Sequence, residues 1–381
     1  MQSVAIGWYL YDRTGDAMAL AYAGLAVFLP IALFSLPGGD VADRVDRRWI
    51  LGTAHLAQAT GSLVLVLLTF VKTQEIWPFY AVLALAGTAR AFSAPAVQSL
   101  LPFLVTRERF PAAVAWSSSA QQSATVLGPA VGGLIYLAGA SASFAACSVA
   151  SLAVATCWFS IRARGGVAQK GSGSAVPRVL EGLRYLRVNR VLLGAISLDL
   201  FAVLLGSITA LLPIYARDIL GVGPDGLGLM RSSIALGAVA MGLALAQLPA
   251  ARQAHAGRSL FLGVALFGFG ALAFAASRNL FFSLGLLALM GAADMMSVFV
   301  RASVVQLGTP DEMRGRVSAV HALFVGTANE LGDFRAGAMA AWLGAVPAVL
   351  AGGCATLAVV ALWSWLFPEL RRVERLAELK T

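Results

Sequence analysis

Six ionisable side chains lie within stretches of the sequence that are otherwise apolar. They are Arg90, Asp199, Asp294, Glu330, Asp333 and Arg335. A charged group away from water is costly, so such residues in membrane proteins face a cavity or the bundle interior and mark proton or substrate pathways. A carboxyl group that is alternately buried and wetted can take up and release a proton, and a nearby arginine opposes that uptake. The six residues are therefore our candidates for coupling protons to a substrate.

Two of the carboxylates differ in how near a basic residue lies along the chain. Asp199 is several residues inside an apolar run, and no basic residue occurs between Arg190 and Arg217. Asp294 has Arg301 about two helical turns away, on nearly the same face, and this arginine can partly hold it ionised. We therefore expect Asp199 to be the proton carrier and place Asp294 second.

The other two acidic candidates share one helix face. Glu330 and Asp333 are three positions apart, and two like charges at that spacing favour protonation of one of them unless Arg335 or Arg90 neutralises the pair. A structural role is the alternative for all four carboxylates, because buried ion pairs can simply fix helix packing. The three histidines lie near helix ends or in a loop, and we assign them no role.

The composition shows what kind of elements hold these residues. The chain is 59% hydrophobic and 12% charged, with a mean hydropathy of +0.79, far from the average of soluble domains. Such a sequence is typical of a polytopic, all-α membrane protein. The apolar runs are Ala17–Pro37, Ile50–Val71, Ile76–Leu104, Val114–Leu137, Ser143–Ile161, Val191–Tyr215, Gly226–Leu248, Ser259–Ala276, Leu280–Val300, Val317–Leu343 and Val346–Phe367.

A shorter apolar run, Ser3–Tyr11, precedes these and completes a plan of twelve helices. It is well below the roughly 20 residues that a membrane span requires. We expect the first helix to be truncated at its N-terminus, either by a late-assigned start or because the chain is a fragment. A signal peptide fits poorly, because the run lacks a basic leading region and a small-residue cleavage site.

Charge and cysteine usage narrow the class of function. The net charge is +9, but the basic residues lie in alternate loops rather than on one face, so we expect no nucleic-acid partner. The three cysteines lie within apolar runs without metal-site spacing. We expect no metal and no cofactor, and the chain has no nucleophile and base pair or phosphate-binding loop that would indicate an enzyme.

The basic loops also predict orientation and domain organisation. Because arginine and lysine accumulate in cytoplasmic loops, the even-numbered loops and the C-terminus are expected on the cytoplasmic side of the inner membrane. Glycines and polar residues mark a linker between the sixth and seventh helices. We predict a six-helix bundle over 1–161, a linker with an amphipathic helix at the lipid headgroups over 162–190, a second bundle over 191–367 and a cytoplasmic tail over 368–381.

Two motifs resemble signatures of the major facilitator superfamily of transporters. The first reads G-x-x-x-D-R-x-x-R-R and consists of Gly39, Asp43, Arg44, Arg47 and Arg48. It lies between the second and third helices, as in the superfamily, and departs from the usual pattern because Asp46 replaces a second glycine. The resemblance implies a gate that holds the cytoplasmic side shut. We expect the Asp43 carboxylate at the N-terminus of the eleventh helix, near Val317 and Ser318, where free N–H groups stabilise an anion.

The second motif lies in the fifth helix. Gly128, Pro129, Gly132 and Gly133 resemble the g-x-x-x-G-P-x-x-G-G signature associated with exporters and antiporters, with Ala124 in place of the leading glycine. Proline bends a membrane helix, and glycine lets a neighbouring helix approach closely. We expect these residues to form a seam with the eighth helix, at Gly237 and Ala240.

Segments of the second half resemble the transmembrane secretion effector group, to which enterobactin exporters are similar. They are Glu181–Leu186, Leu212–Asp218, Pro310–Val317 and Asn329–Gly332. The resemblance implies two six-helix bundles around a central cavity and a monomer that exports small amphipathic molecules, siderophore-like or drug-like, by proton antiport with alternating access. A facilitator or importer of a small solute, or a membrane scaffold or sensor that transports nothing, is the alternative.

Overall fold

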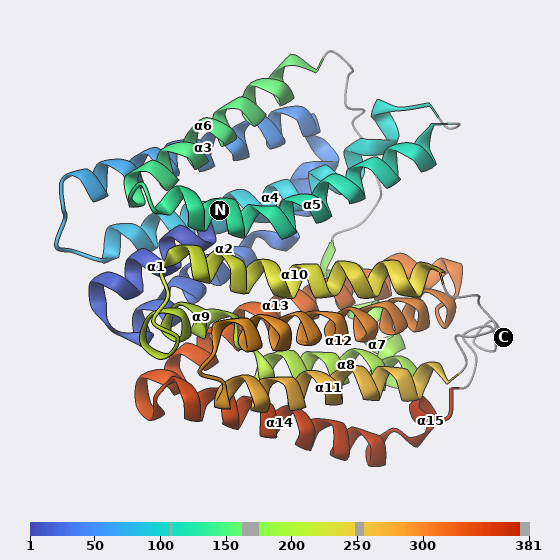
Figure 1. The fold of residues 1–381 in the computed structure, drawn as a ribbon. Coiled ribbons are helices and arrows are strands. Elements are labelled where there is room, and N and C mark those ends of the chain that lie inside the picture. Colours follow the sequence, from blue (N-terminus) through green and yellow to red (C-terminus); the bar gives the residue numbers. More distant parts are fainter. Residues whose placement is uncertain (107–108, 162–174, 248–254, 374–381) are drawn as a thin grey trace. The chain divides into compact units, whose positions relative to one another are not determined.

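The computed structural model describes residues 1–106, 109–161, 175–247 and 255–373, and these form helices joined by short connections (Figure 1). Long apolar segments become helices in a membrane because a helix satisfies every backbone N–H and C=O within one segment. The chain divides into two compact units, one comprising Met1–Gly15 and Tyr22–Val176, and the other comprising Asp16–Ala21 and Pro177–Thr381. The predicted boundaries at 161 and 191 stay predictions, since residues 162–174 of the linker lie outside the described residues.

The helices follow one another along the chain. The first six are α1 (Gln2–Thr14), α2 (Ala17–Arg44), α3 (Arg47–Phe70), α4 (Trp77–Leu104), α5 (Phe110–Tyr136) and α6 (Ala140–Ser160). Those that follow are α7 (Ala175–Val188), α8 (Arg190–Gly206), the 3-10 helix η1 (Thr209–Leu211), α9 (Leu212–Ile214), the π-helix η2 (Tyr215–Ile219), α10 (Pro224–Gln247), α11 (Ala256–Ala276), α12 (Leu280–Leu307), α13 (Asp311–Leu343), α14 (Ala345–Leu366) and α15 (Pro368–Arg371).

The predicted all-helical membrane fold is confirmed. Within the described ranges, nine segments are long and apolar enough to cross a membrane, compared with the twelve helices of the sequence plan. The other three planned helices are α1, which has 13 residues, and the long helices α5 and α13, which are rich in polar side chains.

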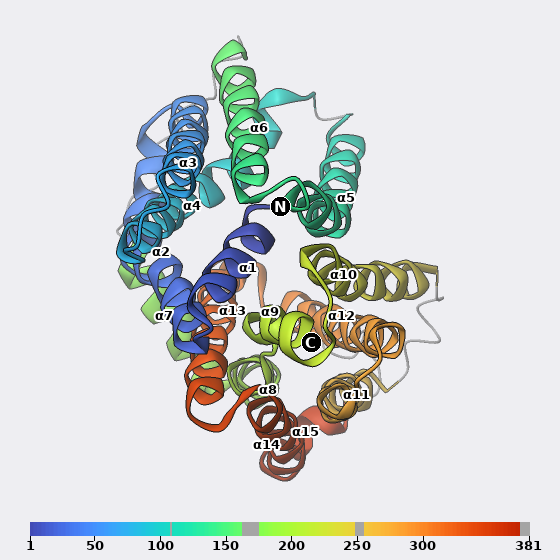
Figure 2. The same cartoon turned by 60° about the vertical axis from the view of Figure 1, so that its left-hand side comes forward.

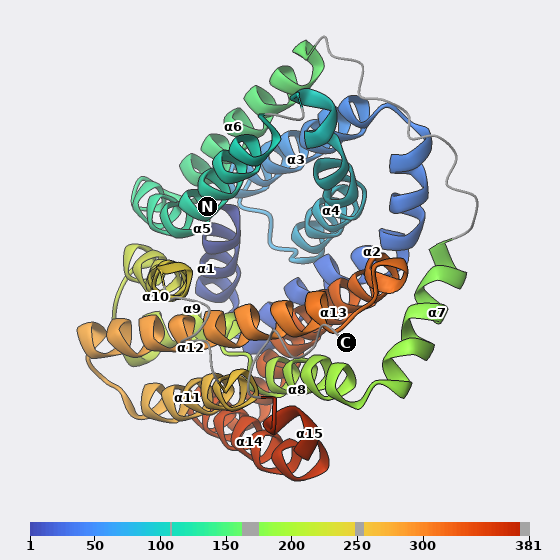
Figure 3. The same cartoon turned by 90° about the vertical axis from the view of Figure 1, so that its right-hand side faces the viewer.

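Helix pairing is the same in both units. In the first, α3 packs along α6 and α4, and α1 packs on α5 and α6; in the second, α11 packs along α14 and α12, and α8 packs on α13 and α14. Figure 3 shows α8, α11, α12 and α14 running beside one another in the second unit. The correspondence is the pattern expected of an internal repeat of six helices.

Close glycine contacts repeat as well. A Cβ atom at Gly87 of α4 would overlap the backbone carbonyl of Val27 in α2, and a Cβ at Gly291 of α12 would overlap the carbonyl of Ile234 in α10. Small residues let helix backbones approach in a membrane, where packing rather than water exclusion drives association. The pairs α2 with α4 and α10 with α12 (Figure 2) are therefore held at short range by glycine at corresponding places.

The predicted amphipathic helix after the linker forms as α7, and protein covers part of its apolar face. Leu186 is buried and Leu183 packs against the core of the second unit. A Cβ at Gly182 would lie 2.6 Å from the backbone oxygen of Arg316 in α13, and the Arg316 guanidinium pairs with Glu181 at 2.7 Å. Leu180 and Val188, which we placed near the same face, are 60% and 82% exposed. Our expectation that lipid headgroups cover the exposed part of α7 therefore stays a prediction.

Candidate functional site

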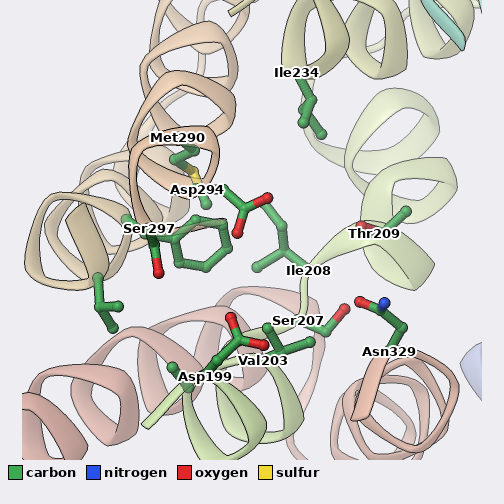
Figure 4. A pocket seen from close by; sticks show the side chains of 13 residues that line it. Asp199, Val203, Ser207, Ile208, Thr209, Ile234, Met290, Asp294, Ser297 and Asn329 are labelled. Atoms are coloured by element: carbon green, nitrogen blue, oxygen red, sulfur yellow. The ribbon is translucent and has the colours of Figure 1, made fainter. Parts of the chain in front are cut away.

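A cavity of about 140 Å³ lies inside the second unit (Figure 4). Two carboxylates, Asp199 of α8 and Asp294 of α12, are directed into it from different helices. The remaining lining residues are apolar or neutral: Ala202, Val203, Ser207, Ile208, Thr209, Ile234, Val264, Phe267, Met290, Ser297 and Asn329. An apolar pocket with a few convergent polar groups is the usual form of a small-molecule site.

Asp199 is held by an arginine. Its carboxylate forms an ion pair with Arg301 of α12, and both side chains are less than 10% exposed. The Nε of Arg301 also donates a hydrogen bond to Nε2 of His321, at 3.0 Å. Because an arginine can only donate, the His321 ring is neutral here and accepts at Nε2. Asp199, Arg301 and His321 thus form one buried polar group that joins α8, α12 and α13.

This arrangement removes the reason for our ranking of the carboxylates, and the identity of the proton carrier stays a prediction. We expected Asp199 to be remote from basic residues, but Arg301 lies beside it. The Arg301 guanidinium therefore neutralises Asp199 rather than Asp294. The reason is the direction of the side chain. Two turns along α12 separate Arg301 from Asp294, and from there the guanidinium reaches across to α8.

Asp294 is the carboxylate that faces the cavity without a partner. Among the described residues it makes no hydrogen bond or ion pair. Ser297 lies three positions further along α12, so the two side chains share a helix face. The Ser297 side chain is 2% exposed and lines the same cavity, and its hydroxyl oxygen has no hydrogen-bond partner in the described part of the chain. A buried polar group is normally paired, so this hydroxyl lacks an expected contact.

A break in the seventh transmembrane helix borders the cavity. α8 ends at Gly206 and the chain resumes in η1 at Thr209. In a continuous helix the carbonyl of Leu204 would bond to the N–H four residues ahead. Here it accepts a hydrogen bond from Nε of Arg335 at 2.9 Å, so a side chain of α13 supplies the missing donor. Backbone groups released inside a membrane need such partners.

Asp333, two residues before Arg335 on α13, binds the residues that follow the break. Asp333 accepts hydrogen bonds from the Ser207 hydroxyl and from the backbone N–H of Ala210. Arg231 of α10 adds charge attraction to the same carboxylate. The Asp333 carboxylate thus lies at the N-terminal end of η1, and the Arg335 guanidinium lies at the C-terminal end of α8. Each charge is opposite to the partial charge of the helix end that it meets. Asp333 and Arg335 are therefore occupied in holding the break.

The two remaining candidates, Glu330 and Arg90, are not among the residues that line the cavity. Glu330 is half-buried on α13, and Arg90 is exposed on α4 in the first unit. Sequence reasoning missed Arg231, His321 and the unpaired Ser297. Arg231 could have been found, since it is a basic residue well inside an apolar run. A single serine in a membrane helix carries no such signal.

The loop motif spans the junction of α2 and α3. Asp46, the departure from the superfamily pattern, caps α3: its carboxylate accepts from the Arg48 backbone N–H at 3.0 Å and pairs with the Arg48 guanidinium at 2.6 Å. The hydrogen bond from the Arg48 side chain lowers the pKa of Asp46. Arg48 also donates to the Ile161 carbonyl. The Asp43 side chain lies outside the described residues, so its predicted contact stays a prediction.

The glycine motif of α5 lies close to the start of the chain. A Cβ at Gly132 would lie 2.6 Å from Cα of Met1, and a Cβ at Gly237 of α10 would overlap the carbonyl of Ala288 in α12. Each of these two glycines therefore meets a residue of its own unit. The predicted seam with Gly237 and Ala240 would join the two units, and it stays a prediction.

Over the described ranges, no group of three or more histidine, cysteine, aspartate or glutamate side chains could hold a metal ion. The functional groups around the cavity are carboxylates, an arginine and hydroxyls.

Comparison with solved structures shows the fold. A peptide transporter in complex with alafosfalin superposes with a TM-score of 0.76 at 13% identity, over 98% of this chain and 92% of that one. A bacterial homologue of the human lysosomal transporter Spinster, in an inward-facing and occupied conformation, gives a TM-score of 0.71 at 12% identity, over 96% of both chains. The chain therefore has the fold of these transporters.

Comparison with characterised sequences gives two informative relatives. Macrolide efflux protein A of Streptococcus pyogenes is 29% identical over 246 residues, a match that spans 64% of this chain and only 61% of that protein. The enterobactin exporter EntS of Shigella boydii is 23% identical over 368 residues, covering 93% of this chain and 84% of the exporter. Both relatives are membrane transporters rather than enzymes.

The family comparison covers almost the whole sequence. The description "transmembrane secretion effector" matches residues 1–379, which agrees with the resemblance seen in the second half and with the superfamily signature at the junction of α2 and α3. The chain belongs to the transmembrane secretion effector family of the major facilitator superfamily, and it is a multi-pass membrane protein.

Proposed function

We propose that the chain is a secondary transporter that exports small amphipathic molecules in exchange for protons. The names of an efflux protein and an exporter among its relatives support export. The proposal includes alternating access, a cytoplasmic gate at Gly39–Arg48 and a location in the inner membrane with the basic loops inside. A facilitator is the alternative, and it would move a solute without responding to a proton gradient.

The observation that carries proton coupling is the contrast between Asp294 and the other carboxylates. Asp199 is neutralised by Arg301, and Asp333 is bound at the break of α8. Asp294 faces the cavity with no partner among the described residues, so it can gain or lose a proton without breaking an ion pair. Water or a solute in the cavity can reach it. We therefore move the proposed proton carrier from Asp199 to Asp294.

The test uses everted membrane vesicles in which respiration acidifies the lumen. Addition of an exported compound should draw protons out of the lumen, which a pH-sensitive dye reports. Rhodamine 6G, an amphipathic cation, and Nile red, a neutral compound, serve as probes. Asp294→Asn should abolish the response, while exchange of labelled for unlabelled Nile red, which is neutral and needs no net proton movement, should persist.

Asp218→Asn is the matched control, because Asp218 is an exposed acid that lies 4.0 Å from Arg217, outside the cavity. This variant should behave as the unmodified chain. A full proton response from Asp294→Asn at equal expression would contradict the assignment of the proton carrier. Probe movement in the unmodified chain that ignores the gradient would favour the facilitator.

A further inference from the structure

We infer that the cavity binds a protonated amine group of the transported molecule, with Asp294 and Ser297 as the recognition pair. This inference rests on the proposed function and names the chemical class of its substrate. It follows from the charge of the cavity, from its unpaired acceptors and from its size.

The charge of the cavity favours a cation. Its lining includes two aspartates and, in the part of the chain that the structure describes, no lysine, arginine or histidine. Arg301 cancels the charge of Asp199. The charge that remains is that of Asp294, and an uncompensated carboxylate in a poorly hydrated site attracts a cation strongly.

The other titratable groups around the cavity are already bound. His321 of α13 accepts from Arg301, and Arg231 of α10 is attracted to Asp333 at the break. The two lining residues from α11, Val264 and Phe267, are uncharged. A proton or a cation entering the cavity therefore meets Asp294 as the available charged group.

Hydrogen bonding identifies the cation as one that carries N–H groups. Asp294 offers two carboxylate oxygens, and the Ser297 hydroxyl, one turn along the same face, is buried without a partner in the described residues. A protonated amine can donate to both acceptors at once, and it supplies the contact that Ser297 lacks. A quaternary ammonium group has no N–H and would leave that hydroxyl unpaired.

The size of the cavity sets how much of the substrate it holds. At about 140 Å³, it is close to the roughly 150 Å³ cavity known to accept benzene. It therefore fits an amine with a small apolar group. Phe267 and Met290 line it beside the carboxylates, and an aromatic face is compatible with a cation. The rest of a larger amphipathic molecule must lie outside the cavity.

Asp294 can bind either a proton or the amine, but not both at once. This competition would couple amine transport directly to proton transport. Binding of the amine requires ionised Asp294, so it displaces the proton, and protonation releases the amine. By linkage each ligand weakens the other by the same factor. Lowering the pH should therefore weaken amine binding, although the amine itself stays protonated.

The test measures binding of two small probes to the purified full chain in detergent. Benzylamine is protonated at neutral pH, and benzyl alcohol has nearly the same shape without the charge. Benzylamine should bind at least about tenfold more tightly, the preference expected of one charge-assisted hydrogen bond. Asp294→Asn should remove the preference, Ser297→Ala should reduce it severalfold, and Asp218→Asn should leave it unchanged.

Thermal unfolding of each variant shows that it is folded, and the conservative Ser297→Ala keeps the test decisive should Asp294→Asn fail to fold. Equal affinity for the two probes, or a preference unaffected by Ser297→Ala, would overturn the inference. Proton-coupled export in the vesicle assay would then still stand. Selective amine binding without a proton response in vesicles would support the inference while contradicting antiport.

Discussion

The two units pair their helices alike, and one ion pair from each shows how different the settings of such pairs can be. In the first unit, Asp46 and Arg48 pair at the junction of α2 and α3, with side chains about a fifth exposed, at 23% and 19%. In the second, Asp199 and Arg301 pair between the interiors of α8 and α12 at 7% and 3%. The comparison shows that units with the same backbone contacts can place an ion pair at a helix junction or between helix interiors.

The largest effect is expected from breaking the interior pair. Arg301→Gln leaves the Asp199 carboxylate buried without a counter-charge, which should cost about 3–5 kcal/mol of unfolding free energy. Denaturant unfolding of the purified chain in detergent measures it. The double variant Asp199→Asn with Arg301→Gln removes both charges and should recover most of the loss. A single variant as stable as the unmodified chain would show that the pair contributes little.

A smaller effect tests whether the backbone contacts are equivalent in the two units. Gly291→Ala and Gly87→Ala should each cost about 1–3 kcal/mol, because the added methyl group meets a backbone carbonyl that cannot move away. Gly285→Ala on α12 is the matched control: a Cβ there meets nothing within 4 Å, so it should be neutral or slightly stabilising. A loss of stability at Gly291 without one at Gly87 would show that the two backbone contacts are not equivalent.

The smallest effect is expected at the junction pair. Because the Arg48 hydrogen bond lowers the pKa of Asp46, the stability it contributes is fully present above the unfolded-state pKa of about 3.9 and is lost as the pH falls through the folded-state value. Asp46→Asn should cost about 0.3–1 kcal/mol at neutral pH. The unfolding midpoints of the two proteins should converge in strongly acidic solution. A constant gap at every pH would exclude this explanation.

The sequence predicted the class, the helices and the family, because hydrophobic runs and loop motifs are local signals. It also identified Asp294 and Asp199, since a carboxylate inside an apolar run is visible without a structure. It could not assign Arg301, because the partner of a side chain two turns away depends on how α12 is rotated against α8. The break after Gly206 was equally hidden. The nearest proline is Pro213, which lies seven residues beyond it, and so the roles of Asp333 and Arg335 at the break did not follow from their spacing.

The central claim is that Asp294 exchanges a proton for the transported molecule, and proton release on binding tests it most directly. Benzylamine is added to the purified chain in a weakly buffered detergent solution, over a range from mildly acidic to neutral pH, and the released protons are counted with an indicator dye. The account predicts release that approaches one proton per bound benzylamine in the acidic part of the range, and none from Asp294→Asn. Binding without proton release at every pH, or the same release from Asp294→Asn, would contradict it.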